Sequence, residues 1–340
     1  MKRKRQTEFE LCNDVLFLII QYVDLYTIYK SVRLVNKQYF EVCNYDQLWE
    51  KVVLKSLNSE TNLFLHLFQE KIVYLDIKSM RFTRKNAFKI SNLSKLQVLN
   101  LLNVYSNSYI NDTFCNNLIH LPLKTLLLPS NDISDHGMVK ISHLSALETF
   151  EMRNNNVISD TCLATCIQKY FFKLKNITFT NVNAVSTSSL CACNRKQLSL
   201  IHVSFCSHLS TESIDYFSQI SNNILKYCVV YGLRISPQVL HNFKYSCPNL
   251  HTFALSYLTS LEIKNLNVSI VPNLRTLILI YCTEVNDAFF KNNNQLKNLI
   301  LCRTKVKIRN KKDYIKVHNQ LDKNNCQLHF IKDVVNMYNK

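Results

Sequence analysis

The stretch Leu123-Lys124-Thr125-Leu126-Leu127-Leu128-Pro129-Ser130-Asn131 decides the fold of this 340-residue chain. Leu126 and Leu128 are separated by one residue, so in an extended strand their side chains point to the same face. Asn131 follows three positions later, where its amide can pack inside a turn and bond neighbouring backbone groups. The stretch therefore predicts a short strand with one buried face, which ends in an inward turn.

The apolar pattern of this stretch recurs roughly every 25 residues, and self-similarity at such a period is typical of solenoid proteins. Stacked units place each strand about 4.8 Å from the last one and build a parallel sheet. The ten apolar sets are Ile72/Leu75/Ile77, Leu96/Leu99/Leu101, Leu123/Leu126/Leu128, Leu147/Phe150/Met152, Leu174/Ile177/Phe179, Leu198/Ile201/Val203, Leu225/Cys228/Val230, Leu250/Phe253/Leu255, Leu274/Leu277/Leu279 and Leu296/Leu299/Leu301.

Helices are expected after the turns, on the opposite side from the strands. Ser134-Asp135 and Ser159-Asp160 each combine an N-cap hydroxyl with an acidic residue that complements the helix dipole. The pattern predicts an α/β fold, a right-handed leucine-rich-repeat solenoid (horseshoe) with about ten repeats over residues 71–330. The expected turn residues are Asn131, Asn155, Cys206 and Cys282, with Val104, Val182, Leu233, Leu258 and Thr304 in the other repeats.

Composition argues against an enzyme. The 13 cysteines include no C-x-x-C pair, and the pairs Cys162/Cys166 and Cys191/Cys193 lack a partner pair at zinc spacing. With no signal-peptide pattern, we expect reduced thiols in the cytoplasm or nucleus, and neither disulfides nor a metal site. Two glycines are too few for the loops that bind nucleotide phosphates. No catalytic motif or apolar membrane span is recognisable, so we expect a non-enzymatic protein without a cofactor or a membrane partner.

The N-terminal residues 8–55 carry no repeat and are expected to form three short helices. The first follows Asn13-Asp14, the second leads into Arg33–Phe40, and the third contains Leu48-Trp49. Three helices in so few residues make a marginal core, and such a module usually needs a partner.

The order of these helices resembles the F-box, and the repeats resemble the cysteine-containing leucine-rich repeats of many F-box proteins. Cys12 stands where proline is usual, and Asn36 and Tyr39 replace the usual Cys and Trp. The resemblance implies the substrate-recognition subunit of a ubiquitin ligase, which binds the Skp adaptor and, through it, cullin and RING subunits. The positions on the F-box pattern are Leu11, Asp14, Val15, Leu16, Val35, Lys37, Leu48 and Trp49. The expected adaptor-binding residues are Leu11, Val15, Leu16, Ile19, Leu48 and Trp49.

A substrate site is expected on the repeats. The net charge is +17, nearly all of it after residue 60, and a basic surface suits an acidic partner. A column of outward positions and a row at the strand ends together suit an acidic or phosphorylated substrate protein with an apolar anchor. Alternatively, the charges keep a solvated face soluble and the tyrosines pack on the rim. The column contains Lys175, Lys226, His251, Arg275 and Lys297, and the row contains Phe205, Gly232, Tyr257 and Tyr281.

A second interpretation treats the N-terminal helices as a cap for the solenoid. The repeats would then be a scaffold that binds nucleic acid or a ribonucleoprotein through the basic face. The remaining segments are expected to be a disordered basic tail over 1–7, a helical linker or cap over 56–70 and a C-terminal tail over 331–340. A lysine- and arginine-rich stretch over 305–316 extends the basic character.

Overall fold

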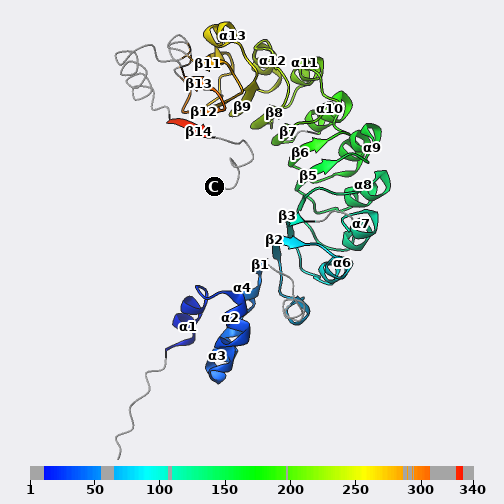
Figure 1. Ribbon diagram of the computed structural model, residues 1–340, viewed down its shortest axis with the longest axis vertical. Coiled ribbons are helices and arrows are strands. Elements are labelled where there is room, and N and C mark those ends of the chain that lie inside the picture. The colour runs from blue at the N-terminus through cyan, green and yellow to red at the C-terminus, as the bar shows by residue number, and fades with distance from the viewer. Residues whose placement is uncertain are drawn as a thin grey trace, which may run out of the picture.

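The computed structural model describes residues 11–54, 65–105, 109–196, 198–285, 289, 293, 295–306 and 327–331. Within these residues, twelve strands form one parallel sheet in chain order. The sheet lines the concave side of a curved molecule, and the helices cover the convex side (Figure 1). The expected tail over 1–7, most of the linker and the basic stretch from 307 to 316 lie outside the described residues. The same holds for the expected C-terminal tail over 331–340, except for Ile331, which belongs to a strand.

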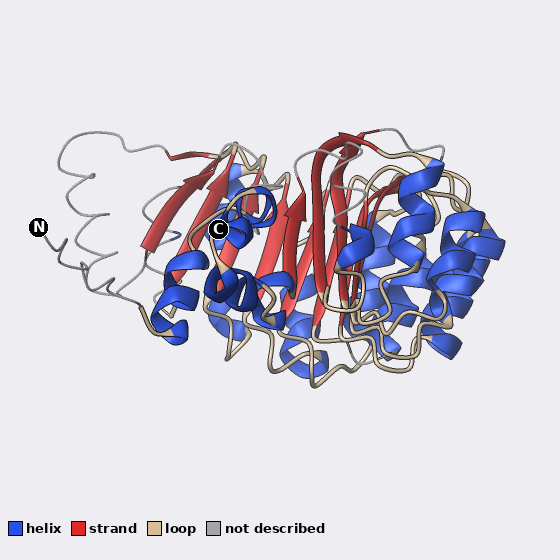
Figure 2. Ribbon diagram, turned by 90° about the horizontal axis from the view of Figure 1, so that it is seen from below, coloured by secondary structure: helices blue, strands red, loops and turns tan. Residues whose placement is uncertain are grey.

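The strands run side by side across the molecule (Figure 2). Their register keeps equivalent repeat positions opposite each other, so that Leu126 pairs with Phe150 and Phe150 with Ile177. The strands of this sheet are β1 (Lys51–Leu54), β2 (Tyr74–Arg81), β3 (Val98–Tyr105), β4 (Thr125–Leu128), β5 (Thr149–Asn155), β6 (Asn176–Val182), β7 (Leu200–Ser204), β8 (Tyr227–Tyr231), β9 (Thr252–Ser256), β10 (Thr276–Ile280), β12 (Asn298–Cys302) and β14 (Gln327–Ile331). A second pair consists of β11 (Glu284–Val285) and β13 (Lys305–Val306).

The convex helices begin where the sequence places N-caps. The side chain of Ser134 accepts a hydrogen bond from the backbone N–H of His136, and Ser159 does the same for Cys162. These helices are α6 (Arg84–Ser91), α7 (Asp112–Leu118), α8 (Asp135–Ser142), α9 (Asp160–Thr165) with the π-helical turn η2 (Cys166–Tyr170), α10 (Thr187–Arg195), α11 (Thr211–Gln219), α12 (Val239–Ser246), and α13 (Ser260–Asn265) with the 3-10 turn η3 (Val268–Ile270).

The core lies between the two layers. All thirty apolar residues of the ten predicted sets are buried, as are the turn residues Asn131 and Asn155. The Asn155 amide donates to the side-chain oxygen of Asn131 at 2.8 Å, which links the turns of neighbouring repeats. The prediction of an α/β leucine-rich-repeat solenoid is therefore confirmed.

The N-terminal module consists of α1 (Asn13–Ile20), α2 (Leu25–Lys30), the 3-10 turn η1 (Val32–Leu34), α3 (Lys37–Cys43) and α4 (Asp46–Trp49). Trp49 is buried at its centre and stacks on Phe68, with ring centroids 3.8 Å apart. The indole N–H donates to the Cys43 carbonyl at 2.7 Å. Strand β1 follows α4 directly and pairs with β2, so the module is continuous with the sheet.

Candidate functional site: two binding surfaces

The expected adaptor-binding residues divide into buried and exposed sets. Leu16 is only 1% exposed, whereas Val15 and Ile19 on the same helix are 40% and 50% exposed. Leu48 and Trp49 are buried in the module core, and Leu11 is partly buried. The expectation that Leu16, Leu48 and Trp49 contact a partner directly is corrected, because these side chains hold the helices together.

The module presents other apolar side chains that the sequence interpretation missed. We call the exposed apolar residues on or just after α1, η1 and α3 the docking surface; Tyr26 on α2 is also exposed but is not included. Two hydrogen bonds from the Gln38 amide, to the Leu11 carbonyl at 2.6 Å and to the Asn13 side chain at 3.0 Å, hold the start of α3 beside the start of α1. The docking surface therefore spans elements that pack together. Its members are Val15, Leu18, Ile19, Tyr22, Leu34, Val35 and Phe40.

The predicted basic column lies at the edge of the sheet where the strands begin. Each member precedes its strand, and its backbone N–H bonds the carbonyl of the equivalent residue one repeat earlier. These distances are 2.8 Å from His251 to Lys226, 2.9 Å from Arg275 to His251 and 2.8 Å from Lys297 to Arg275. The column is thus continuous along the C-terminal repeats.

Two of its cations have partners within the chain. Lys175 forms an ion pair with Glu148 at 2.7 Å, and this contact lowers the pKa of the Glu148 carboxyl. Arg275 donates to the carbonyls of Pro272 and Leu274 at 2.9 and 3.1 Å. The side chains of Lys226 and Lys297 are exposed.

The predicted aromatic row lies at the other edge of the sheet, where the strands end. Phe205, Tyr257 and Tyr281 have φ angles of 54°, 57° and 49°, and Gly232 has 102°. The N–H groups of Phe205, Tyr257 and Tyr281 each donate to the next strand at 3.0 Å, which fixes this left-handed turn. The sequence interpretation missed Arg303, which occupies the same repeat position with a φ of 49°.

The side chains of this row touch each other. The rings of Tyr257 and Tyr281 stack with centroids 5.5 Å apart, and Tyr231 stacks on Tyr281 at 6.0 Å. The Phe205 ring meets the edge of Tyr231 at 4.5 Å. Arg303 lies over the Tyr281 ring and donates to its phenol oxygen at 2.6 Å. We call these five residues the aromatic platform.

Column and platform do not adjoin. Lys226 and Tyr231 are five residues apart along one strand, a separation of about 17 Å. The expectation that the tyrosines lie along the edge of the basic column is corrected, because the two sets occupy opposite ends of the strands.

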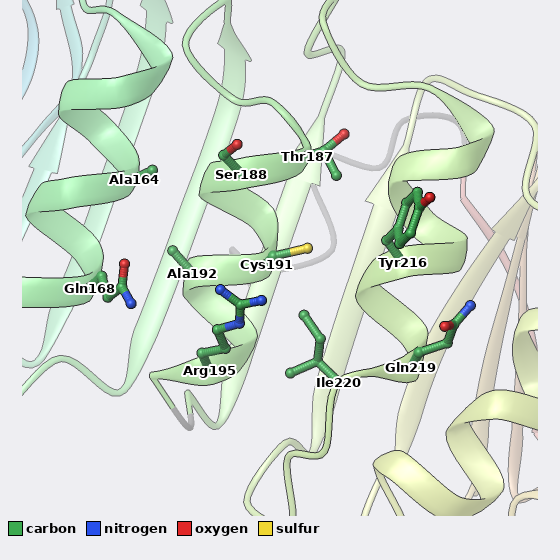
Figure 3. Close-up of a pocket in the computed structure, with 10 residues that line it drawn as sticks. All are labelled: Ala164, Gln168, Thr187, Ser188, Cys191, Ala192, Arg195, Tyr216, Gln219 and Ile220. Atoms are coloured by element: carbon green, nitrogen blue, oxygen red, sulfur yellow. The ribbon is translucent and has the colours of Figure 1, made fainter.

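The convex side carries an open groove of about 510 Å³ between α9, α10 and α11 (Figure 3). Cys191 and Arg195 on α10 and Tyr216 on α11 are among its lining residues (Figure 3). Burial raises the pKa of the Cys191 thiol and raises that of Cys162, in a neighbouring groove, to about 12. A nucleophilic cysteine must be a thiolate, so these protonated thiols do not indicate catalysis.

Two further findings concern only the described part of the chain. It contains no cluster of three or more Cys, His, Asp or Glu side chains that could hold a metal ion. None of its helices has both the length and the apolar character to cross a membrane.

No family model and no curated protein sequence matches this chain. Among solved structures, the complex of Rad7 and Elc1 from yeast contains a chain of similar fold, with a TM-score of 0.52 and 13% identity over 87% of this chain and 89% of that one. An internalin, InlF, from Listeria monocytogenes has a TM-score of 0.48 and 15% identity over 91% of this chain and 89% of its own. The first of these likenesses supports the fold alone.

Proposed function

We propose that this chain is the substrate-recognition subunit of a Skp–cullin–F-box-type ubiquitin ligase in the cytoplasm or nucleus. The observation that carries the proposal is the docking surface on the N-terminal module. Apolar side chains exposed together on one small module mark sites of protein association. The helices that carry them follow the order of the F-box.

The docking surface has the composition of a partner-binding site and remains separate from the module core. Leu16, Leu48 and Trp49 already stabilise the module from inside, so Val15 and Ile19 are not needed there. Their burial against a partner would contribute hydrophobic free energy that the isolated chain lacks. A Skp-type adaptor is the partner that the helix order favours, and cullin and RING subunits would join through it.

The repeats supply the second half of the proposed role. They are continuous with the module through β1 and present a curved sheet to an acidic or phosphorylated substrate protein. The chain itself would perform no chemistry, since the conjugating enzyme arrives with the RING subunit. The yeast complex of Rad7 and Elc1 supports this arrangement as a case in which a chain of similar fold occurs in a complex.

Capture of a purified Skp adaptor by the full chain tests the proposal. The double variant Ile19→Asp/Val35→Asp places two carboxylates on the docking surface and should abolish capture, because a buried charge without a partner is costly. The matched control is Leu261→Asp on α13, an exposed leucine at the far end of the chain, which should leave capture intact. Equal adaptor capture by the double variant and the wild type contradicts the proposal.

A nucleic-acid scaffold is the second candidate, and the exposed cations at the basic edge favour it. Lys226→Glu/Lys297→Glu would then abolish RNA binding, and the wild-type chain would capture no adaptor. Loss of RNA binding in this variant, without adaptor capture by the wild type, replaces the first proposal.

A further inference from the structure

All members of the aromatic platform except Tyr231 have an unfavourable, left-handed backbone conformation. Large side chains rarely adopt positive φ angles, because their Cβ atoms crowd the backbone there. Asn occupies the same repeat position at Asn154 and Asn181, where it tolerates this conformation better. The C-terminal repeats instead place Phe205, Tyr257 and Tyr281 there, and strain of this kind concentrates at functional sites.

The platform packs against apolar side chains on the concave face of the sheet. The strand residues that face away from the helices form a separate apolar cluster, which includes Ile278 and Ile280. Tyr231 belongs to this cluster and Tyr281 packs against it. Burial, together with the hydrogen bond to Tyr281, raises the pKa of the Tyr231 phenol, so the cluster stays uncharged near neutral pH. The rings are therefore fixed before any partner arrives.

Gly232 leaves room for the contact between Phe205 and Tyr231. It has the same repeat position as the aromatic residues but no side chain, and a Cβ there would lie 3.0 Å from the Phe205 backbone nitrogen. The Phe205 ring reaches Tyr231 beside this glycine. Four repeats thus contribute to one continuous aromatic cluster, in which Tyr231 is buried while Phe205 and Tyr257 are exposed.

The ring arrangement favours a peptide over a nucleic acid. Base stacking needs open ring faces. The Tyr281 ring is already stacked against Tyr257 and Tyr231, and Arg303 lies over it. Two of its rings are exposed, Phe205 at 47% and Tyr257 at 38%, and aromatic side chains of this kind supply the contact area of many protein-binding surfaces. The basic column lies at the opposite strand ends, so a polyanion backbone along the platform would not meet it.

Charge favours an acidic peptide. The five strands under the platform, β7 to β10 and β12, contain no Asp or Glu, whereas β2 and β5 carry Asp76 and Glu151. Arg303 places an exposed positive charge at one end of the platform. A carboxylate is the natural partner of a guanidinium next to apolar surface.

We propose that the aromatic platform of Phe205, Tyr231, Tyr257, Tyr281 and Arg303 binds an extended acidic peptide that carries aromatic side chains. The inference deepens the substrate half of the proposed function and rests on it for its biological meaning. The peptide's rings contact Phe205 and Tyr257, and a carboxylate meets Arg303.

The test uses the full chain and a labelled random copolymer of Glu and Tyr, with poly-Glu of equal length and poly(U) as comparison probes in fluorescence anisotropy. The copolymer should bind about tenfold more tightly than poly-Glu, since tyrosine anchors commonly dominate such contacts. Tyr257→Asn should reduce copolymer affinity by about tenfold. Asn already occupies the equivalent backbone position at Asn154, so this variant keeps the fold, which circular dichroism checks.

Two further variants form a matched pair, because each removes one exposed cation. Arg303→Ala removes the platform charge and should weaken copolymer binding by about tenfold, as loss of a charge-assisted contact does. Lys226→Ala removes a charge at the opposite strand end and should change binding by less than about twofold.

Equal losses in this pair, equal binding of poly-Glu and copolymer, or tighter binding of poly(U) that Tyr257→Asn removes would each overturn the inference. Adaptor capture is measured on the same samples. Failure of the wild type to capture the adaptor overturns the ligase role alone, and the copolymer result still decides the platform.

Discussion

The carboxylate of Asp135, at the start of α8, accepts two hydrogen bonds from Ser159 of the next repeat, one from the backbone N–H and one from the hydroxyl, both at 2.7 Å. Ser159 is itself the N-cap of α9. One side chain therefore joins the beginnings of two neighbouring convex helices. Asp112 makes the equivalent pair of bonds to Ser134 one repeat earlier.

This link should contribute measurably to stability. Asp135→Ala leaves the Ser159 N–H without its acceptor, and we expect the free energy of unfolding to fall by about 1–3 kcal/mol. Asp160→Ala is the matched control, because the Asp160 carboxylate bonds only the adjacent Thr161 N–H among the contacts described. Its loss should cost less than about 1 kcal/mol. Urea unfolding followed by circular dichroism measures both, and equal losses would contradict the role of the link.

The strand register predicts opposite effects for two nearby residues. Leu126 is fully buried, so Leu126→Ala should lower the free energy of unfolding by about 2–5 kcal/mol. Lys124 is exposed two residues earlier, and Lys124→Ala should change it by less than about 0.5 kcal/mol. Urea titration of both variants gives the comparison, and similar destabilisation would place Lys124 in the core, against the structure.

Unfolding of the N-terminal module should coincide with that of the first repeats. Trp49 is the only tryptophan of the chain, so its fluorescence reports on the module alone. Because β1 pairs with β2 directly after α4, we expect the fluorescence transition to coincide with loss of the circular dichroism signal during urea titration. A fluorescence change at clearly lower urea, with the dichroism signal intact, would show that the module unfolds by itself.

Stability should also fall in acid because of one buried histidine. Burial and, to a lesser extent, the charge of Arg153 lower the pKa of His202 in the folded protein to about 4. The unfolded chain titrates near the usual value of about 6.5. Above pH 6.5 both states are neutral at this site. As the pH falls from 6.5 towards 4, only the unfolded chain binds the proton, so up to about 3 kcal/mol of stability is lost.

The variant His202→Gln isolates this contribution. It should show a smaller loss of unfolding free energy between pH 7 and pH 4.5 than the wild type, although its stability at pH 7 is lower. Urea midpoints at several pH values supply the measurement. Identical pH profiles for the two proteins would mean that His202 accepts a proton in the folded state.

The fold could be predicted because it depends on local spacing. The apolar triplets predict which residues face inward, and Ser134 and Ser159 predict where two helices begin. The structure confirms the buried residues and the two helix starts. The docking surface was found only in part: Val15 and Ile19 were expected, but so were the buried residues Leu16, Leu48 and Trp49. Nearly every position of α1 is apolar, so the pattern does not distinguish Leu16, which packs inside, from Ile19, which does not.

The platform was predicted in part. The repeat offset located Phe205, Tyr257 and Tyr281, and the same offset one repeat further would have found Arg303. Tyr231 lies one residue before Gly232, which holds the row position of its repeat, and only the alternation of side chains along β8 places Tyr231 on the concave side. The spatial separation of column and platform depends on where the strands begin and end, which the spacing of apolar residues does not fix.

The left-handed position at the strand ends gives this fold a modular character. Its backbone geometry recurs from Asn154 to Arg303, while its side chain changes from amide to aromatic to guanidinium. These repeats thus present different side chains from the same backbone conformation. Replacing Asn154 and Asn181 by tyrosines would remove the 2.9 Å hydrogen bond between their side chains, but it would keep the main-chain geometry and lengthen the row of aromatic side chains by two repeats.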